Sequence, residues 1–93
     1  MVNVNEYFQG KVKSLSFSTK ESKATVGIME AGEYQFNTDG PEIMTVIRGT
    51  LTVKLPGSSD WATFNATQSF KVPGKSRFEL KVPHETAYLC EFR

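Results

Sequence analysis

Turn-forming residues recur along this chain every 8 to 12 residues or so, and this spacing constrains the fold more than any other feature. Clusters of glycine, proline, asparagine and serine occur, for example, at residues 37–41, 56–60 and 73–76. The segments between such clusters are about five to eight residues long, which suits strands and is too short for most helices. We therefore expect an all-β fold with about nine or ten short strands and at most one helical turn.

Several of these segments alternate apolar and polar residues, as half-buried strands do. Residues 51–55 and 78–82 each place three large apolar side chains on one face and two polar ones on the other. This alternation predicts a β-sandwich or a barrel. No linker, repeat or low-complexity segment divides the 93 residues, so residues 1–93 are expected to form one domain.

Composition excludes several classes of function. The 11 basic and 10 acidic residues leave a net charge of +1, which provides no general attraction to nucleic acid or to anionic membranes. No apolar run approaches the roughly 20 residues that span a bilayer, and no secretory signal is visible. The single cysteine, Cys90, excludes an internal disulfide and is expected to be a small buried apolar side chain. The single histidine, His84, excludes metal sites that need two imidazoles from one chain.

The segment from Gly32 to Gly49 resembles the first motif of the cupin superfamily, in which two histidines and a glutamate lie between two glycines. Glu42 occupies the glutamate position, whereas Thr38 and Gly40 occupy the histidine positions. Phe78 stands where the second cupin motif has its histidine. A carboxylate and a hydroxyl alone do not hold a first-row divalent ion. The resemblance therefore implies a single cupin-like jelly-roll barrel that has lost the metal and kept its cavity.

A second resemblance covers almost the whole chain. The blocks that carry it are residues 5–8, 10–14, 32–36, 41–46, 55–56, 60–61, 70–76 and 88–90. In this order they are similar to the small bacterial pyrimidine/purine nucleoside phosphorylase family. The resemblance implies phosphorolysis of purine and pyrimidine nucleosides to free base and (deoxy)ribose 1-phosphate. It also implies a cytoplasmic homodimer that acts on nucleosides and orthophosphate and needs no metal or other cofactor.

Glu42 is the candidate catalytic residue. Phosphorolysis creates positive charge at the ribose C1′ while phosphate attacks from the face opposite the base, so a carboxylate near C1′ stabilises the transition state. Glu42 begins a predicted strand that points into the barrel, where it would bind ribose hydroxyls or stabilise that charge. The alternative is a salt bridge at the barrel mouth.

A set of mostly aromatic residues is expected to contact the nucleoside: Tyr34, Phe36, Thr38, Met44, Phe78 and Tyr88. The first three share one strand face by parity. Stacking of Tyr34 and Phe36 on the base would explain broad specificity, because stacking does not depend on base identity. Tyr88 would donate its hydroxyl to a base carbonyl. The alternative for Phe36 and Phe78 is simple core packing.

The phosphate-binding group is harder to assign from sequence. Arg48 precedes a tight turn, and Lys75 and Arg77 lie in or next to the loop at residues 73–76. Arginine offers a planar fork for phosphate and lysine a point charge. Each could equally be a solvated surface residue, and backbone N–H groups of the turns at 39–41 or 73–75 are a further alternative.

Three functions remain open at this point. The first is a metal-free nucleoside phosphorylase, as the family resemblance implies. The second is a non-catalytic cupin-like module that binds sugars or nucleosides. The third is a structural dimer that presents edge strands to a partner. Phosphate-dependent turnover distinguishes the first, and nucleoside binding without product distinguishes the second from the third.

Overall fold

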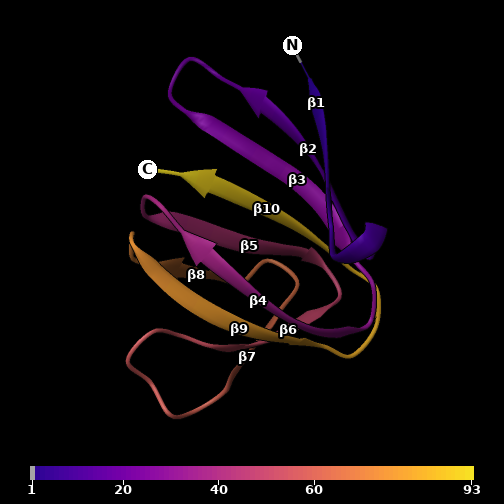
Figure 1. Cartoon of the computed structure of the whole chain (residues 1–93), viewed down its shortest axis with the longest axis vertical. Coiled ribbons are helices and arrows are strands. Elements are labelled where there is room, and N and C mark those ends of the chain that lie inside the picture. The colour runs from indigo at the N-terminus through magenta and orange to yellow at the C-terminus, as the bar shows by residue number, and fades with distance from the viewer. Residues whose placement is uncertain (1) are drawn as a thin grey trace.

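The computed structural model describes residues 2–93 and consists almost entirely of β-strands (Figure 1). The strands are β1 (Asn3–Tyr7), β2 (Val12–Ser18), β3 (Lys23–Met29), β4 (Gly32–Thr38), β5 (Glu42–Arg48), β6 (Thr50–Lys54), β7 (Ala62–Asn65), β8 (Ser69–Val72), β9 (Ser76–Val82) and β10 (Thr86–Phe92). One 3₁₀ turn, η1 (Phe8–Gly10), follows β1. The predicted all-β class and strand number are confirmed. Within residues 2–93 no helix is long and apolar enough to cross a membrane.

The strands pair into two antiparallel sheets. The larger sheet has the order β1-β2-β3-β10-β5-β8, and the smaller has the order β4-β9-β6-β7. Buried side chains from both sheets form one hydrophobic core. The cupin-like prediction of a single barrel is not confirmed in this detail, because the strand pairing gives two separate sheets.

The alternating segments supply this core as predicted. Leu51 and Val53 of β6 are fully buried, and Phe78, Leu80 and Val82 of β9 are at most 4% exposed. β6 and β9 pair directly, so their apolar faces form a continuous surface in the smaller sheet.

Gly49, which connects β5 to β6, is required by close packing. Its φ of +110° favours glycine, and a Cβ at this position would collide with the hydroxyl of Thr86. That hydroxyl accepts a hydrogen bond from the Thr50 N–H (3.1 Å) and donates to the carbonyl of Thr50 or of His84 (3.1 and 3.0 Å). The closing glycine of the cupin-like motif therefore lets β5 and β10 approach at their ends.

The N-terminal segment folds over one side of the space between the sheets. Phe8 and Gln9 both have left-handed backbone conformations, with φ of 52° and 59°, and Gly10 follows at 87°. This turn brings the ring of Phe8 to 5.4 Å from the ring of Phe36, between centroids. Tyr7 contacts Phe36 edge-on at 6.1 Å. The segment thereby forms an aromatic wall against the smaller sheet.

Candidate active site

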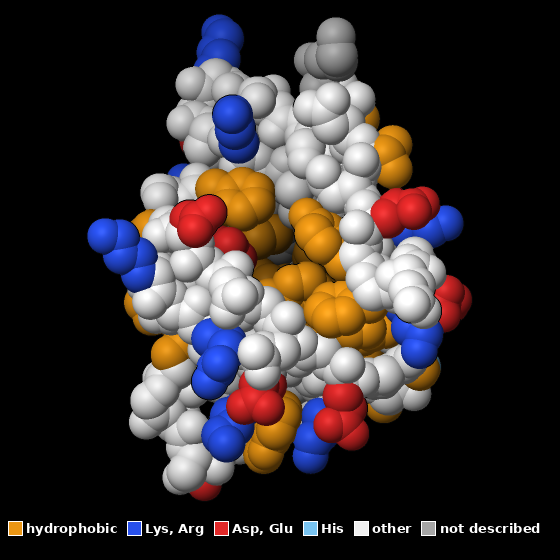
Figure 2. Space-filling view, viewed as in Figure 1, with side chains coloured by type: hydrophobic (Ala, Val, Ile, Leu, Met, Phe, Trp, Pro, Cys, Tyr) orange, Lys and Arg blue, Asp and Glu red, His pale blue; other side chains and the backbone are white. Residues whose placement is uncertain are grey.

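A pocket of about 310 Å³ opens between the two sheets. Figure 2 shows the hollow on this face, with hydrophobic side chains around it and acidic side chains at its edge. The lining residues are Tyr7, Ser14, Thr25, Met29, Phe36, Asn37, Asp39, Gly40, Glu42, Met44, Phe78, Tyr88, Cys90 and Phe92. This is the volume of a small-molecule site, with an aromatic lining and a few polar groups.

Glu42 lies in the pocket wall at the start of β5, as predicted. Its Oε1 accepts a hydrogen bond from the Cys90 Sγ at 3.3 Å. Burial raises the pKa of Glu42, the Cys90 hydrogen bond opposes that rise, and nearby Asp39 adds to it. Among residues 2–93 the ion pairs join Lys13 to Glu6 and Arg93 to Glu91, so no salt bridge holds Glu42.

Cys90 is buried, as predicted, and it is also a hydrogen-bond donor. Strand pairing places it opposite Met44 on β5, so its sulfur reaches the carboxylate of the neighbouring pocket residue Glu42. Burial, together with the Glu42 carboxylate, raises the pKa of the thiol far above its ordinary value. The proton therefore stays on sulfur, and the thiol supports the carboxylate form of Glu42.

Tyr88 lies two residues before Cys90 and also faces the pocket. Burial raises the pKa of its phenol to about 12, which keeps it neutral and able to donate a hydrogen bond. Gly27 of β3 leaves room for this hydroxyl, since a Cβ there would lie 2.9 Å from the Tyr88 oxygen. The same Cβ would lie 2.8 Å from the Ser14 Cβ, so three strands meet closely at this point.

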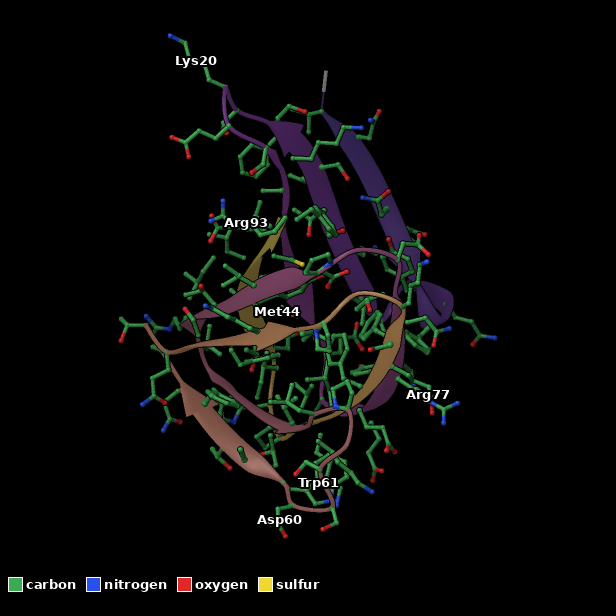
Figure 3. All side chains as sticks on the ribbon, turned by 90° about the vertical axis from the view of Figure 1, so that its left-hand side faces the viewer. Lys20, Met44, Asp60, Trp61, Arg77 and Arg93 are labelled. Atoms are coloured by element: carbon green, nitrogen blue, oxygen red, sulfur yellow. The ribbon has the colours of Figure 1, made fainter. Side chains whose placement is uncertain are left out.

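Phe36 and Phe78 form the aromatic side of the pocket. They are paired across β4 and β9, with ring centroids 5.9 Å apart and an interplanar angle of 28°. Phe36 is half-buried and Phe78 is almost fully buried. Met44 reaches the same space from the larger sheet and lies inside the sandwich (Figure 3).

Tyr34 and Thr38 share the strand face of Phe36, as predicted, but they do not line the pocket. The Tyr34 hydroxyl donates to the Glu30 carbonyl at 2.7 Å. The Thr38 hydroxyl accepts from the Ser76 N–H at 3.0 Å and donates to the Pro73 carbonyl at 2.7 Å. Both polar groups are thus engaged with backbone, and their contact with substrate stays a prediction.

None of the predicted phosphate-binding cations lines the pocket. Arg48 ends β5, at the opposite end of the strand from Glu42. Arg77 precedes Phe78 on β9 and points away from the sandwich (Figure 3). The Lys75 N–H donates to the Asp39 carbonyl at 3.1 Å, so this loop is fixed to the pocket rim by backbone.

Several lining residues were missed by the sequence reasoning. Asn37 and Asp39 flank Thr38 in the cupin-like motif, so the motif itself was a signal that could have found them. Ser14 and Thr25 come from β2 and β3, outside the motif. Only strand pairing brings β3 beside β10 and β2 beside β3, and no local pattern indicates it.

The residues at the cupin metal positions do not fit a metal ion. The Thr38 hydroxyl is engaged with backbone, and Gly40 and Phe78 offer no donor atom. Glu42 is the remaining ligand-type side chain, and its carboxylate accepts the Cys90 hydrogen bond. Within residues 2–93, no group of three or more His, Cys, Asp or Glu side chains is placed to hold a metal.

The two-sheet architecture with a pocket between the sheets is a cupin-like fold. The fold matches that of an RmlC-like cupin from Shewanella frigidimarina with a TM-score of 0.77 at 19% identity, covering 99% of this chain and 83% of that one. The chain belongs to the pyrimidine/purine nucleoside phosphorylase family, whose model matches residues 2–92. This confirms the resemblance found in the sequence.

Individual relatives agree with this assignment. A Pseudomonas fluorescens protein named pyrimidine/purine nucleoside phosphorylase is 60% identical, covering 100% of this chain and 99% of its own. A solved structure of a protein of unknown function from Vibrio parahaemolyticus matches with a TM-score of 0.97 at 48% identity. That match covers 100% of this chain and 99% of the solved one.

Proposed function

We propose that this protein is a pentosyltransferase that cleaves purine and pyrimidine nucleosides with orthophosphate. The products are the free base and (deoxy)ribose 1-phosphate. Membership of the family and the names of relatives about 60% identical over their full length support this activity. The observation that carries the proposal is the half-buried Glu42 carboxylate, which the Cys90 thiol orients inside a pocket of nucleoside size.

In the proposed reaction, phosphate replaces the base at C1′ of the ribose. A phosphate oxygen bonds to C1′ as the bond from C1′ to the base nitrogen breaks, and the bonding electron pair leaves with the base. The proton of the attacking phosphate oxygen ends on the base nitrogen. Glu42 stabilises the positive charge that develops on the sugar, in a pocket that is partly shielded from water.

The aromatic side of the pocket accounts for a broad substrate range. Phe36 and Phe78 provide a surface on which any base can stack. Tyr88, whose phenol is neutral and lies beside Ser14, donates a hydrogen bond to the substrate from the larger sheet. In this proposal Met44 packs against the nucleoside, and Thr38 and Tyr34 hold the wall behind it through their backbone contacts.

We further propose a metal-independent homodimer in the cytoplasm. The unsuitable residues at the cupin metal positions support metal independence. The outer face of the larger sheet carries an apolar groove of about 380 Å³, where Val4, Leu15 and Ile28 are each more than 40% exposed. A second copy of the chain would cover these side chains.

The test is incubation of the purified protein with uridine, inosine and adenosine, with and without phosphate, and with and without excess chelator. The proposal requires release of free bases that depends on phosphate and persists in chelator. Loss of activity in chelator would overturn metal independence. A thermal shift with nucleoside but no product would move the protein to the class of non-catalytic nucleoside-binding modules.

A further inference from the structure

The pocket-facing side of β2 and β3 carries polar groups that the proposed reaction has not yet used. Thr25 lies between Ser16 of β2 and Cys90 of β10 in the strand pairing, and Ser14 lies two residues before Ser16 on β2, opposite Gly27. Asn5 of β1 donates through its Nδ2 to the Ser16 and Ser14 hydroxyls, at 2.7 and 3.3 Å. Ser14 and Thr25 line the pocket. We call Asn5, Ser14, Ser16, Lys23 and Thr25 the polar shelf.

The shelf continues the pocket into an uncovered part of the larger sheet. In Figure 1, β1, β2 and β3 extend above the region that the four-stranded sheet covers. Asn5, Ser16 and Thr25 are only half-buried, in keeping with that position. A ligand that enters the pocket therefore meets hydroxyl and amide groups on this side and aromatic rings from the smaller sheet on the other.

The pocket itself has the wrong charge for a phosphate dianion. Its lining includes two carboxylates, Asp39 and Glu42, and no lysine or arginine. Two negative charges repel a dianion, so a cation must lie beside the pocket. Arg93, at this end of β10, already has its guanidinium 3.4 Å from the Glu91 carboxylate.

Lys23 is a candidate for this cation. It lies two residues before Thr25 on β3, so both side chains project from the same face of the sheet, about 7 Å apart along the strand. Lys23 is exposed, and it makes no ion pair within residues 2–93. Its ammonium group is free to contact an anion held by the neighbouring hydroxyls.

We propose that the polar shelf is the orthophosphate subsite, with Lys23 as its cation. The inference rests on the proposed phosphorolysis, in which phosphate and base lie on opposite sides of the ribose. Phe36 and Phe78 hold the base against the smaller sheet, and Glu42 lies beside the sugar. The shelf on β2 and β3 is the polar surface that remains for phosphate. Serine and threonine hydroxyls and a lysine are suitable donors to phosphate oxygens, and the Asn5 amide orients the Ser14 and Ser16 hydroxyls.

The test compares Lys23→Gln with a matched control, Lys13→Gln. Lys13 is next to Ser14 on β2 and therefore projects from the opposite face, where it contacts Glu6 at 3.6 Å. Initial rates with uridine at varied phosphate should show the phosphate KM raised about 10-fold in Lys23→Gln, because a hydrogen bond to a charged group is lost. The uridine KM should change less than about 2-fold, and Lys13→Gln should behave as wild type.

Ser16→Ala provides a second variant that does not change charge. It should raise the phosphate KM by about 3-fold, because one neutral donor is removed. A wild-type phosphate KM in both Lys23→Gln and Ser16→Ala would overturn the subsite. An equal rise in Lys23→Gln and Lys13→Gln would also overturn it, since that result indicates a general charge effect.

Direct binding separates this proposal from the proposed function. Isothermal titration of inorganic phosphate into the protein, without nucleoside, should give heat with wild type and Lys13→Gln and little with Lys23→Gln. If wild type releases no base but binds phosphate in this Lys23-dependent way, the enzyme proposal fails and the subsite stands. If wild type is active but Lys23→Gln binds phosphate as wild type does, only the subsite proposal fails.

Discussion

The two ends of the sandwich differ in chemistry although the same strands build both. β5 runs from one end to the other, and Glu42, Met44 and Val46 share its inner face. Glu42 is half-buried in the pocket, at the end of the sandwich that we call the open end. Met44 is 3% exposed, and Val46, toward the opposite or closed end, is fully buried. One strand face thus changes from a carboxylate to pure hydrocarbon over five residues.

This comparison shows how a small protein makes a site without a separate domain. At the closed end, β6 and β9 cover the larger sheet with Leu51, Val53 and Leu80. At the open end, Cys90 of β10 lies beside Glu42 of β5 and donates its hydrogen bond to that carboxylate. The buried side chains at the closed end stabilise the fold, whereas the groups proposed to act on the substrate lie at the open end.

The largest effect is expected from damage to the closed end. Leu80→Ala removes a side chain that is 1% exposed, and the cavity left behind should lower the free energy of unfolding by about 2–5 kcal/mol. Urea denaturation measures this loss. Ile47→Ala is the matched control, because Ile47 is 48% exposed on β5, and it should cost far less. Equal losses in the two variants would contradict the role of the buried Leu80 side chain in stabilising the fold.

The next effect is expected at the open end. Glu42→Gln keeps the shape of the side chain and removes its charge, so turnover should fall at least about 10-fold while the melting temperature stays close to that of wild type. Steady-state kinetics and thermal denaturation check the two parts. Glu33→Gln, at an exposed position of β4, is the control and should leave both unchanged. Normal turnover in Glu42→Gln would remove this residue from the mechanism.

Strand patterns predicted which face of a strand each residue occupies better than they predicted which of those residues line the pocket. Phe36, Phe78 and Glu42 line the pocket, as alternation and the motif indicated. Tyr34 and Thr38 share a face with Phe36 but do not line the pocket, because their hydroxyls are hydrogen-bonded to backbone groups and parity does not indicate such bonds. The same parity argument places Arg77, next to Phe78, on the outer face of β9.

The other half of the site depends on pairing between distant parts of the chain. Thr25 comes into the pocket because β3 pairs with β10, which is more than 60 residues later in the sequence. Ser14 reaches the pocket because β2 pairs with β3. Such register is set by the whole sheet and by its turns, so a local pattern cannot reveal it. The hydrogen bond from Cys90 to Glu42 has the same origin, since β5 and β10 are neighbours.

A smaller effect is expected from Cys90, which connects the core to the pocket. Its hydrogen bond holds down the pKa of Glu42, so Cys90→Ala should let that pKa rise further. Fewer molecules would then carry the carboxylate at a given pH, and the acid side of the pH–rate profile should move to higher pH. Cys90→Ser retains a donor and is the control. Profiles that coincide in Cys90→Ala and wild type would contradict a role for the thiol.

The smallest effect concerns stability and follows from the same carboxyl. Burial raises the pKa of Glu42 above its ordinary 4.5, so the folded state binds this proton more tightly than the unfolded state does. Wild type therefore loses stability as pH rises through 4.5 and the higher folded pKa, and the loss is complete at neutral pH. Glu42→Gln lacks this loss, so it should be at least as stable as wild type at pH 7, with a smaller advantage at pH 4. Urea denaturation at both pH values measures the difference, and an advantage that grows toward pH 4 would show that burial does not disfavour the charge.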